Sequence, residues 1–245
     1  MNLRHSWIIA SKDLRAIGKR RTVIYTIVLL PLFLSLLFPG VIGYAYSKAP
    51  DLKISDIAGL LDAFAFWYVI IAAILPSPIA SYSIVGEKVE KSLEPLLATP
   101  VTDGEILMGK SMAAFVPTIL ASYGGAAIYC TLVDWITYGR IGYLYCPNWE
   151  MAVILFLPTP LTALLSKGSN VIASARVTDV RSPSQLGGIL FTPFIGIYLA
   201  GEIGVITLDT GSLLLVSVAF AALVVVMFFL STRTFQREEI LTKWK

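Results

Sequence analysis

Apolar residues in this chain are grouped into long stretches that are separated by short polar segments. The stretches cover residues 22–46, 58–85, 107–132, 151–174, 185–206 and 211–231. Each is long enough for an α-helix to cross a membrane, because a hydrocarbon core about 30 Å thick needs roughly 20 helical residues. The pattern therefore predicts an all-α integral membrane protein with about six transmembrane helices.

Residues 1–21 show a different pattern, in which apolar and basic side chains alternate at roughly helical spacing. The residues concerned are Trp7, Ile8, Leu14 and Ile17 among the apolar ones and Lys12, Arg15 and Lys19 among the basic ones. Such a segment is typical of an amphipathic helix at the membrane interface, among acidic lipid headgroups. The apolar stretch that follows exceeds the core of a signal peptide, so we predict that it is the first span.

Composition and charge agree with a membrane protein and orient it. Of the 245 residues 56% are hydrophobic and 14% charged, which excludes an ordinary soluble globular chain. With six spans, 16 of the 19 Lys and Arg residues lie on the side of the termini, and only Lys48, Lys53 and Arg140 lie on the other. The positive-inside rule then predicts that both termini lie in the cytoplasm. We expect a multi-pass protein of the plasma membrane. This asymmetry explains the net charge of +3 without nucleic-acid binding.

Residues 86–111 are the longest polar interruption and are expected to lie in water. The spacing of three leucines at i, i+3 and i+4 predicts a short amphipathic helix within this loop. They are Leu93, Leu96 and Leu97. Pro100 then breaks the helix, because the residue before a proline is driven out of the helical region. Thr102 and Glu105 have capping-box spacing, which predicts a new helix that runs directly into the third span.

The same loop carries a resemblance to a known family. Its sequence, GEKVEKSLEPLLATPVTDGEILMGK, resembles the cytoplasmic loop of permease subunits of type-2 ABC transporters (the ABC-2 type), which carries the coupling helix that contacts a separate ATPase. Weaker similarities lie at 176–193, RVTDVRSPSQLGGILFTP, and at the C-terminus, FQREEILTKWK. The resemblance implies a single transmembrane domain over residues 1–245. It also implies a dimer, either a homodimer or a heterodimer with a similar permease, driven by two nucleotide-binding subunits.

The resemblance also implies roles for the residues of the loop. Leu93, Leu96 and Leu97 are expected to fill a groove on the ATPase, with polar contacts from Glu87, Glu90 and Glu94. The loop is net acidic, which favours a protein over a lipid surface as its partner. In the family the N-terminal amphipathic helix lies along the inner membrane surface and also braces the ATPase, and the region around 185–211 often holds short re-entrant helices. ATP and magnesium are expected on the partner chain and no cofactor on this one.

Enzymatic chemistry on this chain is not expected. Residues 104–111, GEILMGKS, match the phosphate-loop pattern letter for letter, but no buried strand precedes them and four of them are predicted to be helical, so we expect no nucleotide binding there. His5 is the only histidine, which excludes an H-E-x-x-H zinc site, and no G-x-S-x-G elbow is present.

Lys167, within two turns of the inner end of its span, is expected to reach the interface.

Prolines and small residues lie in or beside most of the spans. The prolines are Pro31, Pro39, Pro76, Pro78, Pro117, Pro158, Pro160 and Pro193. Each removes a backbone donor and frees a carbonyl one turn earlier, which in lipid needs a neighbouring helix, a hydroxyl or a water as its partner. Pairs of small residues four apart, such as Ala121 with Gly125 and Gly196 with Ala200, allow helices to approach closely.

Cys130 and Cys146 both fall on the predicted external side. Two interpretations stay open: a disulfide that braces the loop after the third span, since the outside is oxidising, or two unpaired cysteines.

The function predicted from the sequence is that of a permease subunit of an ATP-driven exporter, since the family mostly exports; the substrate stays open. The alternative is a non-transporting membrane scaffold or assembly factor that recruits a cytoplasmic partner through the 86–111 loop. A self-contained ion-coupled carrier would need a buried carboxylate at mid-span and an inverted repeat, and we find neither in the sequence.

Overall fold

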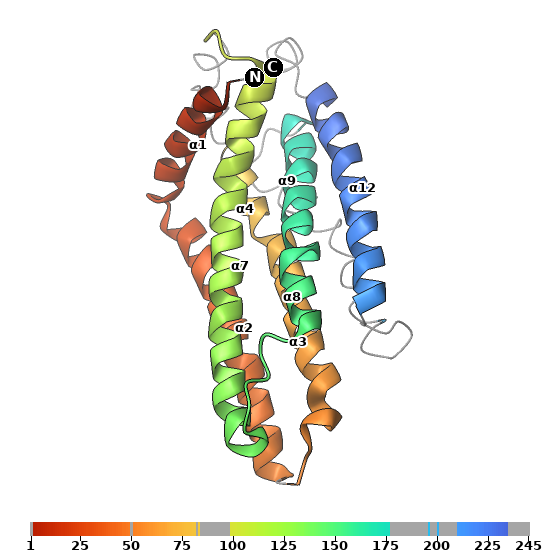
Figure 1. Ribbon diagram of the computed structural model, residues 1–245. Helices are drawn as coiled ribbons and strands as arrows, with labels where there is room; N and C mark the ends of the chain where they lie inside the picture. Colours follow the sequence, from red (N-terminus) through yellow and green to blue (C-terminus); the bar gives the residue numbers. More distant parts are fainter. Residues whose placement is uncertain are drawn as a thin grey trace.

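The computed structural model describes residues 2–49, 51–81, 83, 99–176, 196, 200 and 210–234. All secondary-structure elements of these described residues are helices. Most of the helices run along the axis of an elongated bundle (Figure 1). They are α1 (Leu3–Ile17), α2 (Arg21–Lys48), α3 (Ile54–Ile74), α4 (Pro76–Ser81), α7 (Asp103–Ile141), α8 (Trp149–Phe156), α9 (Pro158–Arg176) and α12 (Thr210–Thr234). We call the end of the bundle that carries α1 and the start of α7 the N-terminal end.

Five helices of the described part are long and apolar enough to cross a membrane. They are Arg21–Lys48, Ile54–Ile79, Asp103–Ile141, Trp149–Asn170 and Thr210–Ser231. The second and fourth combine two helices each, α3 with α4 and α8 with α9. The prediction of an all-α membrane protein is thereby confirmed for the described residues, and five of the predicted spans overlap these helices. The predicted span at 185–206 lies outside the described residues except for two isolated positions.

The last two long helices of the bundle run in the same direction. The α8–α9 segment and α12 both run towards the N-terminal end of the bundle (Figure 1). They lie side by side, since a side chain on Gly168 of α9 would touch Met227 of α12. The end of α9 and the start of α12 therefore lie towards opposite ends of the bundle (Figure 1).

The third span is longer than the sequence pattern predicted. It was expected over 107–132, whereas α7 has 39 residues and ends at Ile141, which makes it about 58 Å long at 1.5 Å per residue. The predicted span ended at 132 because hydropathy falls near Asp134. The helix itself continues, because no residue that would stop a helix follows until Gly142. It ends where Gly142 takes a left-handed conformation with φ of 74°, which favours glycine.

Prolines interrupt two of the candidate spans, and in α2 and α7 they lie within a continuous helix. The break between α3 and α4 falls at Pro76, and the break between α8 and α9 falls at Pro158. The carbonyl that Pro158 leaves without its amide donor is that of Ile154, and the Thr159 hydroxyl donates to it at 2.7 Å. The expectation that a hydroxyl satisfies a freed carbonyl is confirmed at this position.

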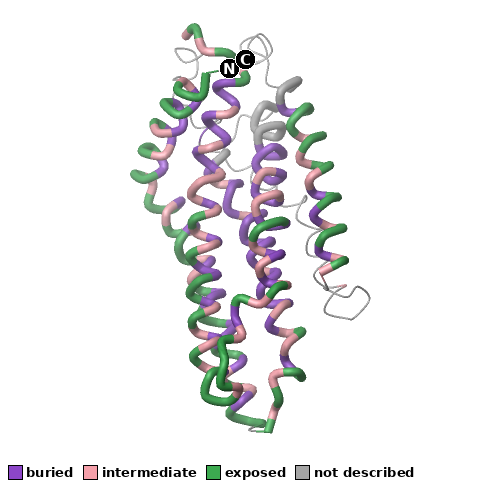
Figure 2. The backbone as a smooth tube through the Cα atoms, in the orientation of Figure 1, coloured by how far each residue is buried: buried purple, intermediate pink, exposed green. Residues whose placement is uncertain are grey.

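The apolar core takes the largest share of its described residues from α3 and the others from α2, α7, α8, α9, α12 and the segment after α7, and a polar contact joins α2, α3 and α7 within it. Ser35 of α2 bonds to the Tyr68 hydroxyl of α3 at 2.7 Å and donates to the Gly125 carbonyl of α7 at 2.8 Å. A Cβ on Gly125 would lie 2.9 Å from the Cβ of Pro31, so the close approach that the small residues predicted takes place here. Outer faces remain apolar and exposed, most clearly on α12 (Figure 2), as lipid contact requires.

Candidate functional site

The predicted coupling residues fall between positions 84 and 98, outside the described residues. They are Glu87, Glu90, Leu93, Glu94, Leu96 and Leu97. The structure does describe Ser83 before this segment and the chain from Thr99 after it. Both attachments contact the N-terminal helix α1, and the contacts form the site described below.

The start of α7 is capped as the sequence predicted. The Thr102 hydroxyl accepts the Glu105 amide at 3.4 Å, and the Glu105 carboxylate accepts the Thr102 amide at 3.1 Å. The same carboxylate also accepts the Asn2 amide at 2.5 Å and lies 3.5 Å from the His5 ring. Glu105 therefore closes the capping box and holds the first turn of α1, a second role that the spacing did not reveal.

α1 crosses α7 closely at a glycine. A Cβ built on Gly109 would lie 2.6 Å from the Ser6 carbonyl oxygen and 2.8 Å from the Cβ of Ile9. Real side chains do not approach backbone atoms to that distance. Glycine at this position therefore permits the crossing of the two helices.

The face that α1 presents to the protein is not the face that carries its most exposed large apolar side chains. The buried residues are Ser6, Ile9, Ala10, Asp13 and Ile17. Of the residues assigned to the apolar side, Ile17 is buried, but Trp7 and Ile8 are 53% and 58% exposed. Small side chains such as Ser6 and Ala10 allow the close helix crossing, and the exposed Trp7 and Ile8 are compatible with the predicted place of α1 at the membrane interface.

A buried ion pair lies next to this crossing. Lys110 of α7 has its ammonium 3.4 Å from the Asp13 carboxylate of α1 and donates to the Ser83 carbonyl at 2.6 Å. The Ser83 hydroxyl in turn donates to Asp13 at 2.5 Å. All three residues are at most 7% exposed. A buried charge without a partner costs several kcal/mol, so these contacts favour an arrangement in which Ser83, α1 and α7 stay together.

A second buried cation extends the cluster to α9. Lys167 is 7% exposed and donates to the Ser111 hydroxyl of α7. One turn along, the Asn170 side chain accepts the Ser77 hydroxyl of α4 at 3.0 Å. The expectation that Lys167 reaches the interface is wrong, because its ammonium turns inward to a hydroxyl of the neighbouring helix. We call Asp13, Ser83, Lys110, Ser111 and Lys167 the polar junction.

Residues 104–111 belong to the regular helix α7 and do not form a loop. Their helical prediction is confirmed. The two residues that would serve a phosphate, Lys110 and Ser111, instead contact Asp13 and Lys167 within the polar junction. A helix directs its amides along its own axis, so this segment does not wrap an anion as a phosphate loop does.

Both cysteines are free thiols in the structure. Cys130 on α7 lies 3.3 Å from the Met151 sulfur, and Cys146 is buried in the segment after α7. The structure agrees with the interpretation of two unpaired cysteines, and the disulfide stays the alternative for the oxidised protein.

The polar junction could not be derived from the sequence, although two of its members carried a signal. Lys110 and Lys167 are cations within apolar stretches, and such residues generally face a partner inside the bundle. Asp13 gave no such signal, because a polar residue in an amphipathic helix is expected to face water. Comparison of the sequence with protein-family models gives no match, and neither does comparison with curated proteins.

Proposed function

We propose that the chain is the transmembrane permease subunit of an ATP-driven exporter of the type-2 ABC class. In this proposal it couples ATP hydrolysis by a separate nucleotide-binding subunit to substrate movement across the membrane. The observation that carries the proposal is the attachment of the 84–98 segment. The stretch that resembles a coupling loop begins at residue 86, shortly after Ser83, and runs into the capped start of α7. Ser83 is bonded to Asp13 of α1 and to Lys110 of α7, and Glu105 of α7 is bonded to Thr102 and to Asn2, which precedes α1.

The proposed coupling passes from the loop into α7. Leu93, Leu96 and Leu97 would occupy a groove on the ATPase, with Glu87, Glu90 and Glu94 at its edge. A displacement of this loop would pull on Ser83 and on the capped start of α7 together, because the polar junction ties them to one another. α7 is a continuous helix of 39 residues, so it would carry the movement along the whole bundle and into α2, which packs along it at Gly125.

The remaining parts of the proposal follow from this arrangement. Both termini would lie in the cytoplasm of a plasma-membrane protein, and the N-terminal end of the bundle would be the cytoplasmic end. Two such chains, identical or similar, would form the permease with two ATPase subunits that hold ATP and magnesium. The exposed apolar residues of α1, Leu3, Trp7 and Ile8, would contact the membrane interface.

A reconstitution assay separates this function from the scaffold alternative. The chain is purified in mild detergent with the ATPase that accompanies it, placed in vesicles, and supplied with ATP and a panel of labelled lipids, amphiphiles and ions. We expect ATP-dependent movement of at least one of these, reduced when Lys110→Met breaks the polar junction. ATP hydrolysis at an unchanged rate with no movement of any probe would favour the scaffold.

A further inference from the structure

Three sulfur atoms from three segments meet in the half of the bundle away from its N-terminal end. Cys130 of α7 has its sulfur 3.3 Å from that of Met151, in the first turn of α8. The Cys130 thiol is also hydrogen-bonded to the thiol of Cys146, in the segment between the two helices. The chain has only two cysteines and five methionines, so both of its thiols and one of its thioethers gather at one place. We call Cys130, Cys146 and Met151 the sulfur cluster.

Hydrogen bonds fix the backbone that carries the cluster. Asp134, one turn after Cys130 on α7, accepts the Cys146 amide at 2.9 Å. Asn148 caps α8 and accepts the Met151 amide at 2.8 Å. Cys146 and Met151 are buried, and Cys130 is partly exposed. The three sulfurs are therefore held in place before any ligand binds, and one of them can be reached from outside.

Two simpler roles do not explain the whole cluster. Buried cysteine and methionine side chains can serve as ordinary apolar groups, but that role gives no reason for sulfurs from three segments to face one another. A disulfide would use the two thiols and leave the Met151 thioether without a part in it. A ligand that contacts all three sulfurs accounts for the arrangement.

The chemistry of three sulfur donors suits a soft metal ion of low charge. Thiolate and thioether ligands select Cu(I), whereas zinc sites generally have four ligands drawn from Cys, His, Asp and Glu. In the described part of the chain no three His, Cys, Asp or Glu side chains are grouped so that they could hold a metal, which disfavours harder ions. Sulfurs about 2.3 Å from one ion in a trigonal site lie about 4 Å apart. The 3.3 Å contact between Cys130 and Met151 would need to open by only about 0.7 Å.

We propose that the sulfur cluster binds one Cu(I) ion through Cys130, Cys146 and Met151. The ion displaces the proton of one thiol, which passes to water, and the thiolate so formed balances the charge of Cu(I). The buried site is then uncharged, and copper keeps its oxidation state. This site goes beyond the expectation that the chain carries no cofactor. It is independent of the proposed function, because it requires only the contact between α7, α8 and the segment that joins them.

The test is competition for Cu(I) between the reduced full chain in detergent and the coloured chelator bicinchoninate, with ascorbate present. We expect one Cu(I) per chain. Cys130→Ser and Cys146→Ser should each weaken binding at least about a hundredfold, since even the loss of a hydrogen-bond partner of a ligand costs 10–100-fold. Met151→Leu, which conserves side-chain volume, should weaken it about tenfold. The matched control Met227→Leu, at a methionine beside Gly168 of α9, should leave the affinity unchanged.

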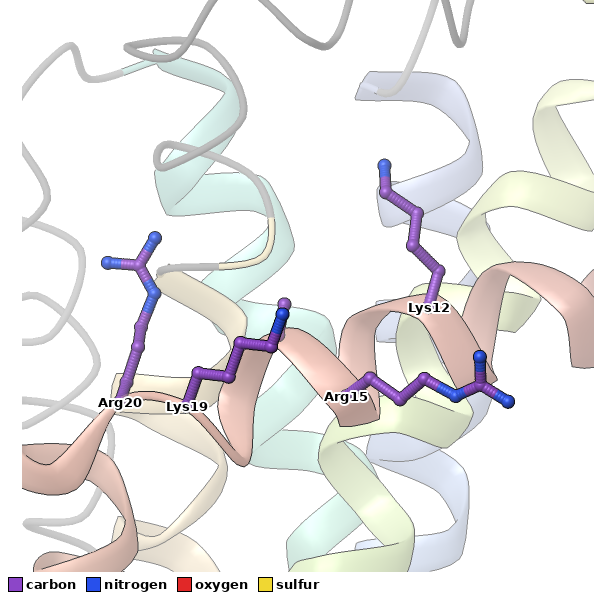
Figure 3. Close-up of a pocket in the computed structure, with 5 residues that line it drawn as sticks. Lys12, Arg15, Lys19 and Arg20 are labelled. Carbon is purple, nitrogen blue, oxygen red and sulfur yellow. The ribbon is translucent and has the colours of Figure 1, made fainter.

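Two further measurements distinguish the cluster from binding by any available thiol. Lys19 is exposed beside the end of α1, at the N-terminal end of the bundle (Figure 3). Lys19→Cys in the Cys130→Ser background restores the number of thiols away from the cluster and should not restore the affinity. X-ray absorption at the copper edge of the loaded, unaltered chain should show three sulfur neighbours at about 2.3 Å.

The outcomes that would overturn the site are equally specific. Unchanged affinity in Cys130→Ser, or affinity regained through Lys19→Cys in that background, would show adventitious binding only. Unchanged affinity in Met151→Leu together with two sulfur neighbours would overturn the three-sulfur site. Thermal unfolding without metal checks each variant, and Met151→Leu should unfold close to the unaltered chain. The Met151→Leu comparison and the absorption spectrum do not depend on the folding of the cysteine variants.

Discussion

Replacing Gly109 by alanine should push α1 away from α7, whereas the same change at Gly104 should not. At Gly109 the added Cβ would lie 2.6 Å from the Ser6 carbonyl oxygen, and at Gly104 it would meet nothing within 4 Å. Ordinary contact begins at 3.4 Å, and the obstructing atom is backbone, which cannot rotate away. α1 must therefore shift by about 0.8 Å.

The cost can be compared with the gain that alanine brings to any helix. Overpacking typically costs about 1–3 kcal/mol, while alanine is favoured over glycine in a helix by about 0.8–1 kcal/mol. A shift of α1 would also lengthen the Lys110–Asp13 contact, which is already 3.4 Å. We expect Gly109→Ala to lower the free energy of unfolding by about 1–2 kcal/mol, and Gly104→Ala to leave it unchanged or raise it.

The assay is thermal unfolding of both variants in one detergent, with hydrogen exchange of the α1 amides as the local measurement. A change of 1 kcal/mol moves the midpoint by about 2–4 °C in a domain of this size. Faster exchange confined to α1 in Gly109→Ala would locate the damage at the crossing. If Gly109→Ala were as stable as Gly104→Ala, with α1 equally protected, the described packing of α1 on α7 would be refuted.

Three further predictions concern other parts of the structure. Asp13→Leu or Lys110→Met alone should each destabilise the protein by about 3–5 kcal/mol, because each removes one half of a buried ion pair. The double variant should recover much of this loss in chemical unfolding, and an additive loss would contradict the pairing. Gly125→Ala should destabilise the bundle by about 1–3 kcal/mol through overpacking, while its neighbour Gly124, which faces open space, should tolerate alanine in the same melting assay. The isolated chain should bind no ATP in equilibrium dialysis, and a micromolar affinity abolished by Lys110→Ala would contradict the helical account of residues 104–111.

Local patterns in the sequence predicted most of the helices. Apolar length predicted where spans occur, because burial in lipid requires it whatever the neighbours are. The Thr102–Glu105 spacing predicted the start of α7 to the residue, since a capping box involves only four consecutive positions. The end of α7 was missed because hydropathy marks where lipid contact ends, and a helix can continue beyond it.

Contacts between distant segments could not be predicted in the same way. Glu105 and Asn2 lie 103 positions apart, and Lys110 and Asp13 lie 97 apart, so no periodicity relates them. The face of α1 that packs on α7 was not predicted, because the sequence pattern placed α1 only at the membrane interface. Apolar character alone does not distinguish a side chain that faces protein from one that faces a membrane.

The central claim is that the 86–111 loop docks a separate ATPase, and affinity purification from detergent-solubilised membranes tests it most directly. The intact chain is compared with the double variant Leu93→Glu plus Leu97→Glu. The control variant is Leu144→Glu, at an exposed leucine of the segment after α7. The proteins that co-purify with each are then identified. The account predicts that an ABC ATPase accompanies the intact chain and the control but not the double variant, at equal expression. Recovery of no ATPase with a monodisperse intact chain, or equal recovery with the double variant, would contradict it.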